Sequence, residues 1–269
     1  MDYPSFRNRK FLDAPISADA LIVEVNDPAS LTRSELSAMS ERIGKCNMAI
    51  YKSRIAHPDM KAVGRQYGLE NLDANWLAGE DGISEIKISE SGKGYIPYTN
   101  KPIKWHTDGY YNPPERKIRA MLLHCSQDAT EGGENRLMDH ELLYCLLMDQ
   151  NPDLVRALSQ VDAMLIPERQ DENGIARAAE SGPVFSSDGG FLHMRYTART
   201  RSIAWKQDEA TRAAVSAIET ILSSPSPYMY TIKLEPGMGI VCNNVLHDRS
   251  AFTGNARLLY RARYYDRIK

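Results

Sequence analysis

The stretch Trp105-His106-Thr107-Asp108-Gly109 places an imidazole and a carboxylate two positions apart. On an extended strand, residues i and i+2 project from the same face of the sheet. His106 and Asp108 can therefore present a nitrogen and an oxygen ligand toward one point. We interpret this segment as part of a metal site that is carried by a β-strand.

A second histidine that can complete such a site lies far downstream. His247 follows the apolar stretch 239–242 and two asparagines, an arrangement typical of a strand that runs into a turn. Two histidines and one carboxylate form the facial triad of non-haem Fe(II) sites, which leaves coordination positions open for other ligands. His106, Asp108 and His247 are therefore the predicted metal ligands and catalytic residues.

The composition is that of an ordinary globular chain: 269 residues, 42% hydrophobic and 25% charged, with a formal net charge of -2. So small a net charge predicts no nucleic-acid partner and no membrane surface. The N-terminal stretch has no apolar signal-peptide core, and no apolar run reaches the roughly 18 residues of a membrane span. Cys46, Cys125, Cys145 and Cys242 have no paired spacing, so we expect free thiols and a cytoplasmic protein.

Hydrophobic periodicity predicts many short strands and a few helices. Helices are expected at 31–43, 59–67, 139–148, 151–160 and 208–222. Strands are expected at 19–25, 47–53, 84–89, 104–110, 119–125, 135–139, 161–166, 183–186, 190–196, 229–234, 239–243 and 256–264. This succession favours a mainly β chain of the α+β class, a sandwich or jelly roll with helices packed outside it.

No change of composition divides the chain, so we predict a single domain over 1–269. Within it, a β/α part at 1–90 is expected to pack on a jelly-roll core at 91–269. The polar stretch 167–182 is predicted to be a long loop. Long loops in compact domains are usually lids or binding loops, and we expect this one to be a lid.

The last predicted strand carries three arginines at even spacing, Arg257, Arg261 and Arg263. Residues at even spacing share one face of a strand, and guanidinium groups on one face repel each other unless anions or acids neutralise them. If this face is interior, it predicts a site for a dicarboxylate, because arginine binds carboxylates with two parallel hydrogen bonds. A solvated basic edge is the alternative.

Taken together, the HTD motif, the Gly132-Gly133 turn, His247, Arg257 and Arg261 resemble the Fe(II)/2-oxoglutarate-dependent dioxygenases of the taurine dioxygenase-like family. The resemblance covers about residues 100–265. It implies a double-stranded β-helix, which is a cupin-like jelly roll with outer helices. It also implies Fe(II) as the metal, 2-oxoglutarate as the co-substrate and O2 as the oxidant, with succinate and CO2 as products.

Position by position, the resemblance implies that His106, Asp108 and His247 bind iron. Arg257 would pair with the distal carboxylate of 2-oxoglutarate, and Arg261 would border that carboxylate or an anionic group of the substrate. Two departures from the family pattern concern the 2-oxoglutarate site. The spacing from His247 to these arginines is shorter than usual, and Asn135 stands where a threonine usually contacts 2-oxoglutarate, although its amide can still donate a hydrogen bond.

Further residues are candidates for substrate binding. Arg195 and Tyr196 lie before the last long helix, in a region that often contacts substrate in related enzymes. Tyr98 and Tyr110 flank the predicted metal strand and are placed to line a pocket. Each also has an ordinary interpretation: a solvated loop for Arg195, and core packing with a hydrogen-bonded hydroxyl for the tyrosines.

We therefore predict an oxidoreductase that oxidises, most simply hydroxylates, an unactivated C–H bond of a small polar, anionic or zwitterionic metabolite. Two alternatives stay open at this stage. The same triad could serve an iron oxygenase or oxidase that uses no 2-oxoglutarate, or a non-catalytic, metal-dependent sensor of a dicarboxylate. Neither the substrate nor the choice between hydroxylation, desaturation and cyclisation can be inferred from the sequence. A homo-oligomer is compatible with it.

Overall fold

The computed structural model describes residues 2–73, 78–89, 95–171, 174–201 and 203–269. Its larger sheet has six strands in the order β1-β2-β16-β5-β19-β3. All neighbours in this sheet are antiparallel except β1 and β2, which run parallel. The strands are β1 (Ile22–Glu24), β2 (Met48–Lys52), β16 (Met238–Cys242), β5 (Ala120–Gln127), β19 (Leu258–Tyr264) and β3 (Ser84–Ile86).

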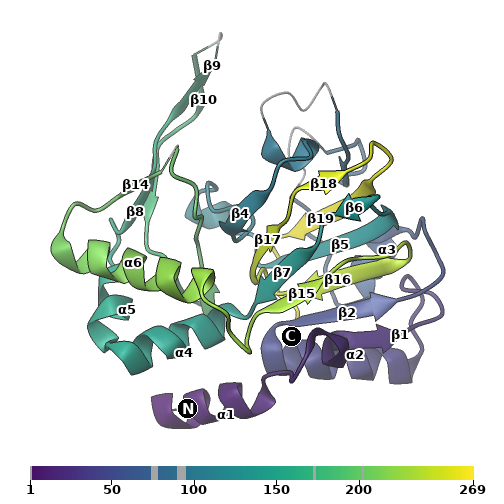
Figure 1. Cartoon of the computed structure of the whole chain (residues 1–269), viewed down its shortest axis with the longest axis horizontal. Helices are drawn as coiled ribbons and strands as arrows, with labels where there is room; N and C mark the ends of the chain where they lie inside the picture. The colour runs from purple at the N-terminus through teal and green to yellow at the C-terminus, as the bar shows by residue number, and fades with distance from the viewer. Residues whose placement is uncertain (1, 74–77, 90–94, 172–173, 202) are drawn as a thin grey trace.

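A smaller antiparallel sheet of four strands faces it, in the order β15-β7-β17-β4 (Figure 1). Its strands are β15 (Tyr230–Ile232), β7 (Asn135–Met138), β17 (Leu246–Arg249) and β4 (Ile103–His106). Buried side chains from both sheets form one core cluster, in which Leu123 and Ile240 of the larger sheet pack with Leu137 of the smaller one. Two facing sheets with one shared core confirm the predicted jelly-roll class.

Helices cover the outer faces of both sheets. The helices α2 (Arg33–Cys46) and α3 (Met60–Gln66) pack on the larger sheet through a cluster that includes Met39, Val63 and Leu122. The helices α4 (His140–Gln150), α5 (Pro152–Leu158) and α6 (Glu209–Ser223) form a separate apolar cluster. This cluster includes residues of the smaller sheet. The described part of the chain also contains the short 3-10 helices η1 (Ala18–Leu21), η2 (Ile96–Tyr98) and η3 (Pro114–Arg116).

The first helix, α1 (Tyr3–Asp13), was not predicted from the sequence. Its buried residue is Lys10, and the ammonium group of Lys10 lies 2.6 Å from Asp139 and 2.8 Å from Glu141. Because the buried residue of this helix is charged, its sequence lacks the stripe of buried apolar side chains that predicts an amphipathic helix. This explains why the helix was missed.

The prediction that 167–182 is a loop is wrong. The segment contains β9 (Arg169–Asp171) and β10 (Gly174–Arg177), which pair as a projecting hairpin, and β11 (Glu180–Gly182) (Figure 1). We call the hairpin 169–177 the arm. At its base, β11 pairs with β8 (Met164–Ile166), which also pairs with β14 (Ala204–Trp205). The only apolar residues in the sequence of the arm are the adjacent Ile175 and Ala176, so it lacks the alternation by which half-buried strands are recognised.

Two further antiparallel pairs complete the described strands. The strands β12 (Phe185–Asp188) and β13 (Phe191–Met194) pair with each other, and β6 (Glu131–Gly132) pairs with β18 (Phe252–Thr253). The second pair brings the Gly132-Gly133 turn against the segment that follows β17.

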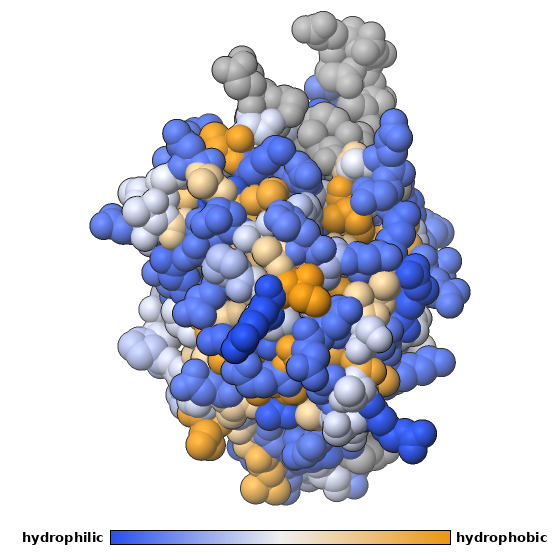
Figure 2. Space-filling model, turned by 90° about the vertical axis from the view of Figure 1, so that its right-hand side faces the viewer, coloured by the Kyte–Doolittle hydropathy of each residue, from blue (hydrophilic) through white to orange (hydrophobic). Residues whose placement is uncertain are grey.

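The surface and the thiols agree with a water-exposed exterior and a dry core. The face seen in Figure 2 is mostly hydrophilic, with its apolar residues scattered over it. Among the described residues, every helix is too short or too polar to cross a membrane. All four cysteines are buried and free, as predicted.

Candidate metal centre

His106 is the last residue of β4, and Asp108 lies two positions further on. At this point the chain forms backbone hydrogen bonds with the segment around Tyr196. The amide of Thr107, between them, donates to the carbonyl oxygen of Tyr196 at 3.0 Å, and the amide of Tyr196 donates back to Thr107 Oγ1 at 3.1 Å. These bonds fix Thr107 just past the end of β4, and Asp108 begins the turn that follows, so the strand predicted over 104–110 ends at His106.

His247 lies on β17, directly opposite His106 in the antiparallel register. The two imidazole ring centroids are 4.2 Å apart. One ligand atom from each of His106, Asp108 and His247 lies within 4.8 Å of the other two. The structure therefore brings the three predicted ligands to one point, although they come from positions far apart in the chain.

Hydrogen bonds select the nitrogen atom that each imidazole offers. Nδ1 of His106 lies 2.9 Å from the carbonyl oxygen of Lys104, and Nδ1 of His247 lies 3.0 Å from that of Val245. A carbonyl oxygen can only accept, so each Nδ1 carries the proton and each Nε2 keeps a lone pair for a metal. Burial, and then the neighbouring His247, lowers the pKa of His106 to about 3, which keeps this ring neutral.

Asp108 is the charged member of the group. Burial opposes its ionisation, but Arg261 and Arg263 outweigh that effect and hold the pKa of its carboxyl well below the usual range. Its Oδ1 accepts a hydrogen bond from Arg261 Nη1 at 3.2 Å, whereas its Oδ2 is buried and has no hydrogen-bond partner among the described residues. A free carboxylate oxygen beside two imidazole lone pairs fits a divalent iron with open coordination positions.

Asn244 holds the backbone of Asp108 and was not singled out from the sequence. Its Oδ1 accepts from the amide of Asp108 at 2.8 Å, and its Nδ2 donates to the carbonyl oxygens of Asp108 at 3.0 Å and Ile118 at 2.7 Å. Its φ of 50° is left-handed, a conformation that asparagine tolerates better than most residues. The turn Asn243-Asn244 thereby carries the chain from β16 of one sheet to β17 of the other.

The variant Asn244→Gly should weaken iron binding about 10-fold, because glycine keeps the left-handed backbone but removes the amide that orients Asp108. Calorimetric titration of the apoprotein with Fe(II) under anaerobic conditions measures this effect. Iron affinity equal to that of the wild type would show that Asn244 has no part in placing the ligand.

A small cavity adjoins the triad between the two sheets. Among the residues that line it are His106, His247, Asn135, Arg249, Arg257 and Arg261, together with apolar side chains such as Ile103, Met121, Leu123 and Leu259. Arg257 is 5% exposed and forms no ion pair among the described residues. Burial lowers the pKa of Arg257, and burial followed by the charge of Arg257 lowers the pKa of Arg249 to about 9. Both groups remain cationic at neutral pH.

The donors of this cavity outnumber its acceptors. Asn135 Nδ2, Arg249 Nε and Arg261 Nε are buried and have no hydrogen-bond partner among the described residues. Buried donors are costly unless they are paired, and two buried guanidinium groups without an acid are costlier still. This donor set fits a dianionic, oxygen-rich ligand next to the metal, as 2-oxoglutarate is.

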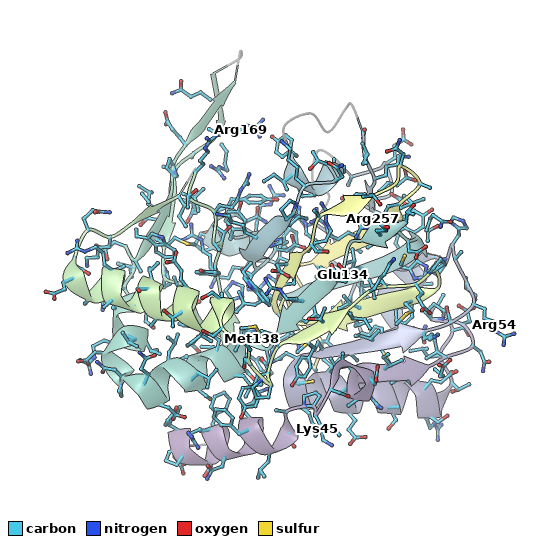
Figure 3. The ribbon with its side chains drawn as sticks, in the orientation of Figure 1. Lys45, Arg54, Glu134, Met138, Arg169 and Arg257 are labelled. Atoms are coloured by element: carbon cyan, nitrogen blue, oxygen red, sulfur yellow. The ribbon has the colours of Figure 1, made fainter. Side chains whose placement is uncertain are left out.

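The Gly132-Gly133 turn lies against Arg257, which lines the cavity. Both residues have positive φ, 71° and 79°. A Cβ on Gly132 would lie 2.1 Å from the carbonyl oxygen of Ala251, and one on Gly133 would lie 3.3 Å from Arg257 Nε. The turn therefore needs glycine for its conformation and for the close approach of Arg257. Figure 3 shows Arg257 and the neighbouring Glu134 on the same side of the molecule, near the starts of β19 and β7.

The arginine-bearing face of β19 is interior. This is the condition under which the arginines were predicted to bind a dicarboxylate, and it argues against a solvated basic edge. Arg261 and Arg263 lie on the face of β19 that approaches Asp108, while Ala262 and Tyr264 pack on the helix side. Arg263 is neutralised by Asp73. Arg257 lies just before β19, beyond an irregularity in the register, and so stands apart from the other two.

The structure places the predicted substrate residues in different environments. Arg195 uses its guanidinium to bind three backbone carbonyls, of Tyr110 at 2.7 Å, Met164 at 3.0 Å and Glu180 at 2.8 Å. Tyr196 is fully buried in the core beside α4, α5 and α6, and Tyr98 is buried in the core between the sheets. Tyr110 is partly buried, and its hydroxyl accepts from Arg199 at 3.2 Å.

The chain is similar to one protein family and to solved structures of non-haem iron oxygenases. The model of the family described as "Taurine catabolism dioxygenase TauD, TfdA family" matches residues 22–263. A search of curated proteins gives no match. Two solved structures share the fold. Non-heme iron oxygenase OrfP in complex with Fe and alpha-ketoglutaric acid has 14% identity and a TM-score of 0.64, over 88% of this chain and 81% of that one. Asparagine oxygenase in complex with Fe(II), 2S,3S-3-hydroxyasparagine and succinate has 12% identity and a TM-score of 0.59, over 98% and 92%.

Proposed function

Because the chain belongs to the TauD, TfdA family of dioxygenases, and is thus a non-haem Fe(II)/2-oxoglutarate-dependent oxygenase, we propose that it hydroxylates a C–H bond of a small, amino-acid-like metabolite. The observation that carries the assignment is the cluster of His106, Asp108 and His247 beside a cavity in which Arg249 and Arg257 have no acid partner among the described residues. In this proposal the substrate RH, 2-oxoglutarate and O2 become ROH, succinate and CO2.

Each residue of the site has a separate role in this proposal. His106, His247 and Asp108 Oδ2 would hold the iron, and Arg257 with Asn135 would hold 2-oxoglutarate. When bound, the iron and 2-oxoglutarate supply the oxidant through oxidative decarboxylation. The apolar side chains that line the cavity, among them Met121, Leu123 and Leu259, exclude water from the metal and so strengthen the electrostatic contacts there.

Two of the similar structures support an amino-acid-like substrate. One holds OrfP with succinate and (3S)-hydroxy-L-Arg, and the other holds asparagine oxygenase with hydroxyasparagine. At 16% and 12% identity these structures share the fold, so they supply a class of compound to test and not the substrate itself.

The contacts of the arm support two parts of the proposal: the substrate is zwitterionic or anionic, and the arm acts as a lid. Arg195 ties the base of the arm to Tyr110, two residues after Asp108. Arg177 of the arm lies 5.9 Å from the ring centroid of Tyr111, and Arg169 lies 5.2 Å from that of Tyr95, in the segment before β4. Figure 3 shows Arg169 on the arm, away from the sheets. The arm thus brings two arginines close to tyrosines on either side of the segment that carries His106 and Asp108.

A screen of amino acids and their derivatives tests the proposal. The protein would be loaded with Fe(II) anaerobically and then given 2-oxoglutarate, O2 and one compound at a time, with succinate and the oxygenated product measured together. We expect one compound to give both in equal amounts. O2 uptake without succinate would favour an iron oxygenase that does not use 2-oxoglutarate, and a failure of 2-oxoglutarate to bind the iron-loaded protein would refute the proposal.

A further inference from the structure

Arg249 is a buried arginine two residues after the predicted ligand His247 on the same strand, and it is only 4% exposed. Alternate residues of a strand share a face, so Arg249 and His247 project to the same side of β17. In the register of the smaller sheet, Arg249 pairs with Ile103 of β4 on one side and with Asn135 of β7 on the other. It therefore lies between the strand that carries His106 and the residue expected to contact 2-oxoglutarate.

One end of its guanidinium holds the segment 97–101. Nη1 donates to the carbonyl oxygen of Pro97 at 3.3 Å, and Nη2 donates to those of Thr99 at 2.8 Å and Lys101 at 2.6 Å. This segment leads directly into β4, and Pro97 lines the cavity beside the metal ligands. Three bonds from one planar group fix the path of the chain immediately before the metal strand.

The rest of the guanidinium faces the cavity. Nε of Arg249 is buried with no hydrogen-bond partner among the described residues, and Arg249 lines the same cavity as Arg257. The guanidinium carbons of Arg249 and Arg257 lie 4.8 and 4.9 Å from the ring centroid of Phe252. Within the described part of the chain, neither arginine forms an ion pair. Two neighbouring buried cations without an acid repel each other, and an anion between them would remove that repulsion.

We infer that Arg249 is a positioning residue for 2-oxoglutarate, which couples the bound dicarboxylate to the segment 97–101 and through it to the strand that carries His106. This inference rests on the proposed function. Binding of the dicarboxylate stabilises the arrangement in which Arg249 holds the segment, and an ordered segment in turn strengthens dicarboxylate binding, because such coupling is reciprocal.

The test compares Arg249→Lys with the wild type, both loaded anaerobically with Fe(II). Lysine keeps the charge but cannot bind three carbonyls and a ligand at once. We expect the Kd of 2-oxoglutarate to rise about 10-fold while the Kd of iron changes less than about twofold. Hydrogen exchange supplies a second readout: 2-oxoglutarate should slow exchange of the amides at 99–104 in the wild type and leave it unchanged in the variant.

Arg136→Lys is the matched control, because Arg136 follows Asn135 on β7 but pairs with Asp248 on the outer side of the sheet. An unchanged Kd of 2-oxoglutarate in Arg249→Lys, or an equal loss in the control, would overturn the inference. If Arg249→Lys does not fold, the wild-type exchange experiment decides: no slowing at 99–104 on binding refutes the coupling. Normal binding in Arg249→Lys alongside lost binding in Arg257→Ala would refute this inference and leave the proposed function standing.

Discussion

Replacement of Asp108 by alanine is expected to abolish turnover, with a loss of at least about 1,000-fold in succinate formation. The variant removes the only charged ligand of the predicted triad and leaves Arg261, which lies 3.2 Å from Asp108 Oδ1, without its acid partner. Two neutral imidazoles then face two guanidinium groups, an environment that repels a divalent cation. Fe(II) binding should fall with activity, and anaerobic calorimetry measures it directly.

Asp248→Asn is the control for this experiment. Asp248 is adjacent to His247 on β17, but it pairs with Arg136 and takes no part in the cluster. The control variant should bind iron like the wild type. Retention of iron and turnover in Asp108→Ala, or an equal loss in Asp248→Asn, would contradict the assignment of the triad.

The second large effect is expected for Arg257→Ala, which should weaken 2-oxoglutarate binding about 100-fold, or about 2.7 kcal/mol. Arg257 is the buried guanidinium that has no ion-pair partner among the described residues, so a ligand carboxylate is its natural counterion. Iron binding should be unaffected, because Arg257 does not contact Asp108. Titration of the iron-loaded variant with 2-oxoglutarate under anaerobic conditions provides the measurement.

The variant Arg261→Ala tests which of the two predicted arginines, Arg257 or Arg261, binds 2-oxoglutarate. Arg261 is bound to Asp108, so its loss should perturb the metal ligand as well as the cavity. We expect a smaller change in the Kd of 2-oxoglutarate than for Arg257→Ala, accompanied by weaker iron binding. The reverse order of effects would assign 2-oxoglutarate to Arg261.

Local rules account for what could be predicted from the sequence. The spacing of His106 and Asp108 on a strand defines a shared face without knowledge of the fold, and hydrophobic periodicity located most helices and strands of the jelly roll. The same rules failed where the local signal is absent. The helix α1 buries Lys10, and the only apolar residues of the arm are the adjacent Ile175 and Ala176, so neither shows the apolar pattern from which elements are predicted.

The partners of polar groups could not be predicted in this way. Arg195 was expected at the substrate, but the structure directs its guanidinium to three backbone carbonyls. Asn244 and Arg249 were not singled out, although they hold Asp108 and the segment before β4. The contacts of Asn244 with Asp108, of Arg249 with Thr99 and of Arg195 with Tyr110 each join residues more than 80 positions apart. The other two contacts of Arg195 are nearer in sequence, but they too lie outside any local pattern.

The sequence alone therefore determined the chemical identity of the centre: two imidazoles, one carboxylate and a strand rich in arginine. The tertiary structure decided which of those arginines remains without an acid. Arg263 and Arg261 are neutralised by Asp73 and Asp108, whereas Arg257 and Arg249 both lie close to the Phe252 ring and have no carboxylate partner among the described residues. The physical reason is that a charge is defined by its own residue, but its neutralisation depends on the register of strands brought together from opposite ends of the chain.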